Sequence, residues 1–240
     1  MFLIITMAGR YQRFLTEGFK TPKYLLPWGD KTILAELLFN LNKDKPFKDI
    51  FLVANHRDNS YFPHVRVSMN IHKIQQNNLI ITSDTSGQLE TARIGVEALE
   101  NIHGEIDEPI VIHNIDTILF NRNFKEIESL LNLNSGYIDI FSANNKEYSY
   151  VLVEEDNRVT EIAEKIVVSD LATSGLYGFR NSKVFKKYAN NNDIFISSVF
   201  RKMIEDDQFI LASKKYKEDS TMVLGTPEEY LKASQISLVL

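Results

Sequence analysis

Short apolar segments alternate along this chain with longer segments of helical spacing, and this alternation constrains its fold more than any other feature. Residues 2–6 (FLIIT) form a short, almost entirely apolar segment that leads into a small-residue turn. A run of this length, rich in β-branched residues, is typical of a strand buried on both faces of a parallel sheet. Residues 49–54, 78–82 and 109–113 each predict another strand.

Segments with helical spacing lie between these strands. Asp30 is placed to cap a helix whose apolar residues would share one face, and residues 88–100 carry a second apolar stripe. Alternating strands and helices predict an α/β fold in which helices cover both faces of a mostly parallel sheet. The first stripe contains Ile33, Leu34, Leu37, Leu38 and Leu41, and the second contains Leu89, Ala92, Val96 and Leu99.

The second half of the chain predicts shorter elements, with a hairpin turn at residues 155–157. No Gly/Ser-rich linker, low-complexity tract or internal repeat divides the sequence, so we expect one domain over residues 1–240. The predicted strands are residues 137–143, 149–154, 158–162 and 176–179, and the predicted helices are residues 182–189, 197–205 and 227–234.

The composition excludes several classes of function. A formal net charge of -5 argues against a general nucleic-acid binder, because such domains carry a basic surplus. The absence of cysteine rules out disulfides, iron–sulfur clusters, cysteine zinc sites and a thiol nucleophile. The opening apolar run is too short for a signal peptide, and no apolar stretch approaches the roughly 20 residues that cross a bilayer. We therefore expect a cytoplasmic protein without a membrane partner.

Cationic residues follow the first predicted strand. In an open parallel sheet, ligands bind beyond the carboxyl ends of the strands. There the Ala8-Gly9 turn would let backbone N–H groups approach a phosphate, while Arg13 and Lys23 would supply a guanidinium fork and a point charge. Pro22 restricts the backbone before Lys23. Charge and spacing alone equally allow an ordinary loop with solvated cations.

The motif Met7-Ala8-Gly9-x-x-x-Arg13-Phe14, followed by Pro22-Lys23, resembles the signature of the sugar-phosphate nucleotidyltransferases, the GT-A-like family of nucleotide-sugar pyrophosphorylases. Similar segments follow in the family's order, from Phe2 to about Tyr230. The resemblance implies a three-layer, Rossmann-like α/β fold with a mostly parallel central sheet and a small added β-region. It further implies a nucleotide-binding half at about residues 1–120 and an acceptor-binding half at about residues 121–240.

The resemblance assigns nucleotide and metal roles to residues of the first half. Residues 85–92 (TSGQLETA) are similar to the base-recognition segment, so Gly87 and Gln88 would bind nucleotide together with Ala8 and Gly9. Asp116 ends the fourth predicted strand, where the family holds Mg²⁺. From the residues alone, Ser86 could simply cap a helix, and Asp116 could simply cap a turn.

Acceptor roles fall in the second half. Residues 161–165 (EIAEK) and 174–179 (SGLYGF) are similar to two family strands. By that similarity, Glu164 would bind acceptor hydroxyls, Lys165 would bind the acceptor phosphate, and Gly175 would leave room for the acceptor. Without the resemblance, Glu164 and Lys165 could be an exposed ion pair on an edge strand.

Two positions depart from the family pattern. Tyr11 stands in the phosphate loop where many members have glycine, and Val223 stands where many have a second metal-binding aspartate. The chain would then hold Mg²⁺ through Asp116 and the substrate phosphates, or its metal site would be weakened.

The resemblance implies in-line transfer of a nucleotidyl group from a Mg-bound nucleoside triphosphate to a small phosphorylated acceptor, with release of pyrophosphate. Arg13 and Lys23 would be the catalytic cations, and a sugar 1-phosphate of a surface-polysaccharide pathway would be the acceptor. A homo-oligomer is possible in such proteins. Two alternatives remain: a GT-A glycosyltransferase, whose Asp-x-Asp pair is absent around Asp116, and a non-catalytic nucleotide-binding domain, suggested by Tyr11 and Val223.

Overall fold

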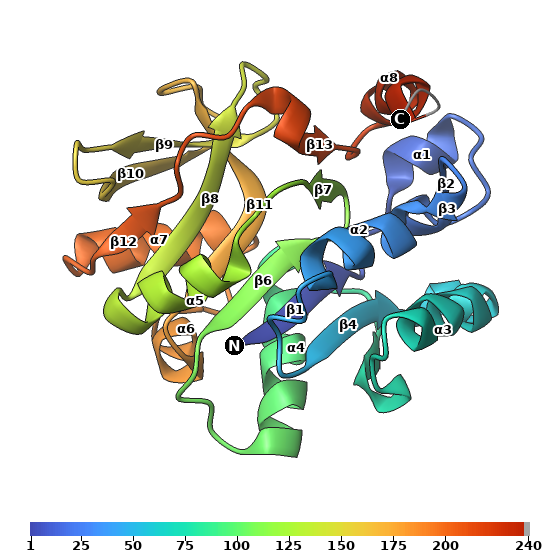
Figure 1. Cartoon of the computed structure of the whole chain (residues 1–240), viewed down its shortest axis with the longest axis horizontal. Coiled ribbons are helices and arrows are strands. Elements are labelled where there is room, and N and C mark those ends of the chain that lie inside the picture. Colours follow the sequence, from blue (N-terminus) through green and yellow to red (C-terminus); the bar gives the residue numbers. More distant parts are fainter. Residues whose placement is uncertain (238–240) are drawn as a thin grey trace.

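A computed structural model describes residues 1–237. Its centre is a nine-stranded sheet between two layers of helices (Figure 1). The strands lie in the order β10-β9-β11-β6-β1-β4-β5, with β8 and β12 extending the sheet from β11. The predicted three-layer α/β fold is therefore confirmed.

Four parallel strands form one half of this sheet. β1 (Phe2–Met7) lies between β4 (Ile50–Asn55) and β6 (Ile110–Asn114), and β5 (Leu79–Thr82) pairs with β4 on the outside. The sequence predicted all four to within one residue, because each is apolar along almost its whole length. Their carboxyl ends meet at one edge of the sheet, where ligands bind in open α/β folds.

The other half of the sheet contains mostly antiparallel pairs of strands. β11 (Leu171–Phe179) runs antiparallel to β6, β8 (Gly136–Ser142) and β9 (Ser149–Val153), and β10 (Val159–Glu164) forms the expected hairpin with β9. The prediction of a strand at residues 176–179 was too short, since β11 begins five residues earlier. β11 thus links the parallel half to the hairpin.

Several short strands were not predicted, because two or three residues carry too little periodicity. β12 (Ile210–Ala212) pairs with β8, and β7 (Thr117–Leu119) pairs with β13 (Thr221–Val223) in a separate ribbon. β2 (Pro27–Trp28) and β3 (Lys31–Thr32) form another ribbon. The β7–β13 ribbon brings residues 221–223 beside the chain that leaves β6.

Helices cover both faces of the sheet because successive side chains of the central strand β1 point to opposite faces, and both sets are apolar. Leu3 and Ile5 pack into one apolar cluster with α2, α3 and α5, while Phe2 and Ile4 pack into another with α4, α6 and α7. The first group is α2 (Ile33–Asn42), α3 (Phe62–Ile71) and α5 (Phe124–Leu133), and the second is α4 (Gln88–His103), α6 (Ser182–Tyr188) and α7 (Ile196–Glu205).

The end of the chain returns to its beginning. α8 (Pro227–Ser237) lies beside α1 (Gln12–Thr16) in Figure 1, and the rings of Phe14 and Tyr230 are 6.3 Å apart. Thr226 and Glu229 form a reciprocal capping box: Thr226 Oγ1 accepts from Glu229 N–H at 3.2 Å, and Glu229 Oε2 accepts from Thr226 N–H at 2.9 Å.

One predicted helix cap is wrong, and three helices were not predicted. α2 is capped by Thr32, whose Oγ1 accepts from Ala35 N–H at 3.2 Å, and not by Asp30. α1 was missed because its five residues carry little periodicity, and α3 because polar residues interrupt its apolar stripe. α5 was missed although Phe124, Ile127 and Leu131 have helical spacing. Short 3₁₀ turns complete the elements: η1 (Lys23–Leu25), η2 (His56–Tyr61), η3 (Gln76–Asn78) and η4 (Glu218–Ser220).

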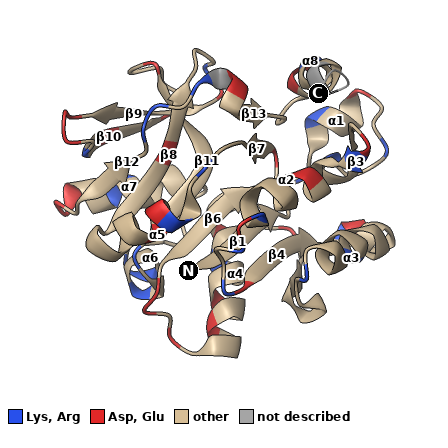
Figure 2. Ribbon diagram, in the orientation of Figure 1, with Lys and Arg blue, Asp and Glu red and all other residues tan. Residues whose placement is uncertain are grey.

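Charged residues lie mainly on helices and connecting loops, while the strands are largely uncharged (Figure 2). Within residues 1–237, none of the helices has the length and apolar character needed to cross a membrane.

Candidate active site

A cleft of about 810 Å³ opens at the carboxyl ends of β1 and β6 and extends to β10 and β11. All ten site residues proposed from the sequence line it, although they come from both halves of the chain. They are Ala8, Gly9, Arg13, Lys23, Gly87, Gln88, Asp116, Glu164, Lys165 and Gly175.

Lys23 and Asp116 meet on the cleft wall. Lys23 begins η1, Asp116 follows β6, and Lys23 Nζ lies 2.5 Å from Asp116 Oδ2. Both side chains are mostly buried, with 14% and 25% of their surface exposed. Burial raises the pKa of the Asp116 carboxyl, but the Lys23 ammonium outweighs it, so the pKa is below its ordinary value. Asp116 is therefore an anion at neutral pH.

Arg13 reaches across the cleft from α1. Its Nη2 lies 2.7 Å from Oε2 of Glu147, which stands in the loop between β8 and β9, and both side chains are about half exposed. Hydrogen bonding by Arg13 lowers the pKa of the Glu147 carboxyl. An exposed pair of this kind contributes little stability. The Arg13 guanidinium can therefore exchange Glu147 for another anion at small cost.

The Ala8-Gly9 turn is held from one side. Arg57 Nη2 donates to the carbonyl oxygens of Ala8 at 2.6 Å and Gly9 at 2.9 Å. The position that a Gly9 Cβ would occupy has no other atom within 4 Å, so this edge of the cleft is open.

The start of α4 packs against the segment that leads into α7. Gly87 is the N-cap of α4, and a Cβ there would lie 2.7 Å from the backbone oxygen of Ile194. Leu89 N–H donates to that oxygen at 2.9 Å. The Gln88 amide donates to Asn114 Oδ1, which turns Gln88 toward the end of β6. Ser86 does not cap α4 with its side chain.

Glu164 is held by two hydroxyls at the far end of the cleft. Its Oε2 accepts from Ser149 Oγ at 2.5 Å and from Ser197 Oγ at 2.8 Å. Ser149 lines the cleft, whereas Ser197 lies behind it on α7 and is 1% exposed. In the described part of the chain, no ion pair joins Glu164 to Lys165.

Gly175 occupies a position that no larger residue fits. Its φ is 84°, and a Cβ would lie 2.6 Å from Asn114 Nδ2. Its carbonyl faces Nδ1 of the buried His113 at 3.3 Å, and the other ring nitrogen of His113 lies 2.8 Å from Thr117 O. His113 thus packs between β11 and the turn that carries Asp116.

A sequence profile of the protein family described as "Nucleotidyl transferase" matches residues 4–238. The chain belongs to this family. The predicted family is confirmed, and with it the prediction that the protein is a nucleotidyltransferase enzyme. A search of curated proteins found no significant match.

Solved structures support the fold of this nucleotidyltransferase. A nucleoside-diphosphate-sugar pyrophosphorylase from Vibrio cholerae RC9 has a TM-score of 0.82 at 23% identity, over 97% of this chain and 99% of that one. A UDP-glucose pyrophosphorylase complexed with UDP-glucose has a TM-score of 0.74 at 20% identity, over 98% and 97%. A putative glucose-1-phosphate thymidylyltransferase from Bacillus anthracis has a TM-score of 0.74 at 16% identity, over 100% and 95%.

The nucleotidyltransferase offers one carboxylate, not a complete metal cage. Residues 1–237 contain no group of three His, Cys, Asp or Glu side chains able to hold a metal ion. Val223 lines the cleft near Asp116, and both oxygens of the nearby Glu229 already accept hydrogen bonds, from Tyr148 and Thr226. Mg²⁺ commonly binds through one or two carboxylates, water and substrate phosphates. Asp116 therefore fits as one ligand of a magnesium ion whose other ligands are water and substrate oxygens.

Sequence reasoning missed several residues of the cleft. Glu147, Ser149 and Glu229 line it, while Arg57 and Ser197 hold residues that do. Each meets its partner through the tertiary fold: Glu147 is 134 residues from Arg13. A polar residue gives no local signal of such a contact.

Proposed function

We propose that this nucleotidyltransferase transfers a nucleoside monophosphate from a Mg-bound nucleoside triphosphate to a small phosphorylated acceptor, a sugar 1-phosphate. The supporting observation is that Arg13 and Lys23 line the same cleft as Asp116 and the acceptor residues Glu164, Lys165 and Gly175. Two phosphate-binding cations thus stand between a turn suited to a triphosphate and a region suited to hydroxyls.

In the proposed reaction, an acceptor phosphate oxygen attacks the α-phosphorus of the triphosphate. A new P–O bond forms, the bond from the α-phosphorus to the bridging oxygen breaks, and pyrophosphate leaves with the electron pair. A phosphate anion is already a nucleophile at neutral pH, so alignment and charge neutralisation supply the catalysis. Magnesium bound with the triphosphate would neutralise phosphate oxygens, with Asp116 as one ligand.

The cations exchange partners in this scheme. Arg13 leaves Glu147 to bind the triphosphate and the departing pyrophosphate, and Lys23 keeps contact with Asp116 while it bridges the α-phosphate and the acceptor phosphate. Ala8, Gly9, Gly87 and Gln88 hold the nucleotide.

Hydroxyl-binding groups support a sugar acceptor. Glu164, Ser149, Thr173 and Ser174 line the same cleft as Lys165 and would bind acceptor hydroxyls. Solved structures of similar fold include proteins named for UDP-glucose and glucose 1-phosphate. The halves at about residues 1–120 and 121–240, a cytoplasmic location, a surface-polysaccharide role and homo-oligomer formation remain predictions.

The test is pyrophosphate release measured with CTP, UTP, dTTP, ATP and GTP, each combined with a panel of sugar 1-phosphates. We expect release with at least one pair, dependent on both substrates. Consumption of a nucleotide sugar without pyrophosphate would instead indicate a glycosyltransferase. Thermal stabilisation by a triphosphate without either reaction would indicate a nucleotide-binding domain.

A further inference from the structure

Tyr11 adopts a backbone conformation that a residue with a side chain rarely takes. It is the N-cap of α1, with φ 37° and ψ 38°, in the left-handed region. Such a conformation persists where surrounding contacts fix it, and it often occurs at functional sites. Tyr11 lies between the Ala8-Gly9 turn and Arg13, so whatever fixes Tyr11 also fixes this edge of the cleft.

One buried carboxylate fixes Tyr11. Asp58, which is 1% exposed, accepts from the Tyr11 hydroxyl on Oδ1 at 2.7 Å and from the Tyr24 hydroxyl on Oδ2 at 2.9 Å. Burial, together with Asp58, raises the pKa of both tyrosines, so both hydroxyls remain protonated donors. Each oxygen of Asp58 is thus committed to a different segment of the cleft.

These two segments carry the two proposed catalytic cations. Tyr11 lies two residues before Arg13, and Tyr24 directly follows Lys23. Both tyrosines line the cleft, whereas Asp58 does not. Asp58 therefore acts on the cleft only through other residues.

Arg57, the residue before Asp58, also contacts the segment that contains Tyr11. Arg57 donates to the carbonyl oxygens of Ala8 and Gly9, and its guanidinium lies 5.9 Å from the centre of the Tyr11 ring. Both residues belong to η2, directly after β4, the neighbour of β1. The Ala8-Gly9 turn is thus held by residues that follow the adjacent strand, β4.

We propose that Asp58 is a positioning residue that sets the phosphate-binding geometry of the cleft by holding Tyr11 and Tyr24 together. This inference rests on the proposed function for its catalytic consequence. It predicts that losing the Tyr11 hydroxyl weakens phosphate binding although that hydroxyl points to Asp58 rather than to substrate.

The test compares Tyr11→Phe with Tyr188→Phe. Tyr188 makes the same kind of bond outside the cleft, donating to Asp206 Oδ2 at 3.0 Å. Inorganic pyrophosphate, which carries no base, is the calorimetric probe. We expect Tyr11→Phe to weaken pyrophosphate binding about five- to tenfold, the effect of one net hydrogen bond, and Tyr188→Phe to leave it unchanged.

Steady-state kinetics give a second readout that general destabilisation would not produce. In Tyr11→Phe the KM for the triphosphate should rise while the KM for the acceptor stays constant. Asp58→Asn should show a larger effect of the same kind if it folds. If Asp58→Asn does not fold, Tyr11→Phe alone tests the proposal.

Pyrophosphate binding as tight in Tyr11→Phe as in the unaltered protein would overturn the proposal, as would an absence of pyrophosphate binding in both. Unaltered protein that binds pyrophosphate but transfers no nucleotide would count against the proposed function alone. Normal transfer with no effect of Tyr11→Phe would count against the positioning role alone.

Discussion

The Lys23 ammonium and the Asp116 carboxylate lie 2.5 Å apart, although 93 residues separate them in the chain. Lys23 lies after the Ala8-Gly9 turn in the chain, while Asp116 lies in the turn that follows β6, the strand beside β1. The pair holds the ammonium at the rim of the parallel strands before any substrate arrives. A preorganised charge of this kind costs no rearrangement during the reaction.

Replacing either proposed catalytic cation should abolish most turnover. Lys23→Ala or Arg13→Ala should lower kcat about 10²-fold or more, because each removes a charge that stabilises the transferring phosphates. Lys183→Ala is the matched control, since Lys183 pairs with Glu105 at 2.8 Å outside the cleft. Rates near normal in both cleft variants, measured by pyrophosphate release from folded protein, would remove these residues from the mechanism.

Asp116 should give stability an acid dependence with a definite sign. Its pKa in the folded protein lies below the ordinary value of 3.8, so its ion pair contributes stability above that pH, and the contribution is lost as pH falls through the folded pKa. Urea unfolding at several pH values between about 7 and 3 should show Asp116→Asn less stable than the unaltered protein by a constant amount near neutrality. That difference should shrink below about pH 4. A difference that grew in acid would contradict the assignment.

The strands and the cleft residues were predictable for different reasons. β1, β4 and β6 are buried on both faces, so a local apolar run is enough to identify them. The ten cleft residues followed from short motifs, and the fold brings them together.

What the sequence did not reveal depends on contacts between distant segments. Asp58 meets Tyr11 across 47 residues, and nothing in its neighbours indicates that it is buried. The α2 cap shows the same limit at short range: Asp30 and Thr32 are both good capping residues, and the β2–β3 ribbon places Thr32 at the helix start.

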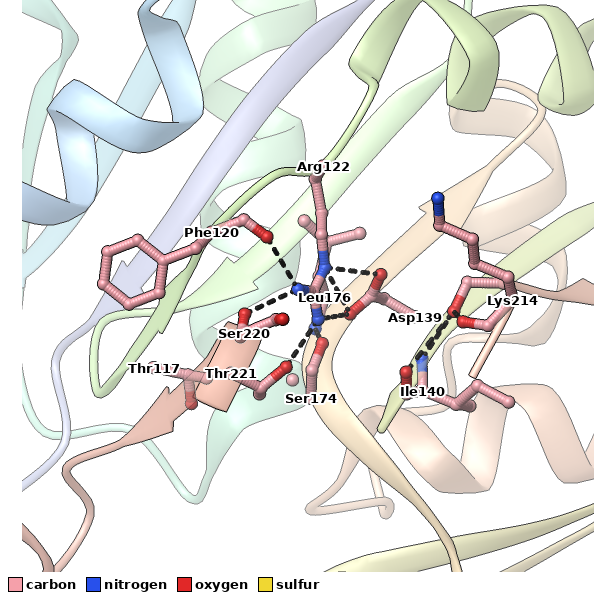
Figure 3. Close-up of polar contacts among 12 residues, drawn as sticks. Thr117, Phe120, Arg122, Asp139, Ile140, Ser174, Leu176, Lys214, Ser220 and Thr221 are labelled. Carbon is pink, nitrogen blue, oxygen red and sulfur yellow. Dashed lines mark hydrogen bonds and ion pairs between the residues drawn. The ribbon is translucent and has the colours of Figure 1, made fainter. Parts of the chain in front are cut away.

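A buried ion pair behind the cleft should be the most sensitive point for stability. Arg122 and Asp139 are both fully buried, and Arg122 Nη2 lies 2.8 Å from Asp139 Oδ2 (Figure 3). Arg122 also donates to Ser220 O and Thr221 Oγ1, both at 2.6 Å, which ties the β13 ribbon to β8. Removing one partner leaves a buried charge unpaired, so Arg122→Met or Asp139→Leu should each cost about 3–5 kcal/mol in the free energy of unfolding.

Two comparisons define this effect. The double variant Arg122→Met with Asp139→Leu should recover much of the loss, because no charge is then left unpaired. Arg158→Met, which breaks an exposed pair with Asp207, should cost about 1 kcal/mol or less. Equal losses at the buried and exposed pairs in urea unfolding would disprove the expectation.

Gly175 and Gly18 separate backbone strain from steric conflict. Their φ angles are 84° and 86°, but a Cβ at Gly18 meets nothing within 4 Å, whereas one at Gly175 lies 2.6 Å from Asn114 Nδ2. Both alanine variants should lose about 1–2 kcal/mol to left-handed strain. Gly175→Ala should lose about 1–3 kcal/mol more from overpacking, and much of its turnover because Asn114 must shift. Identical stabilities and rates for the two variants would argue against a tight contact at Gly175.

Ser197 should matter to the acceptor although it lies outside the cleft. It is buried on α7 and donates to Glu164 Oε2 at 2.8 Å, which orients the carboxylate proposed to bind acceptor hydroxyls. Ser197→Ala should therefore raise the KM for the acceptor about tenfold, in line with one hydrogen bond to a charged group, with an unchanged KM for the triphosphate. Ser182→Ala is the control, because Ser182 is equally buried and donates to Glu100 Oε1 at 2.6 Å away from the cleft. If both serine variants changed the two KM values alike, Ser197 would have only a structural role.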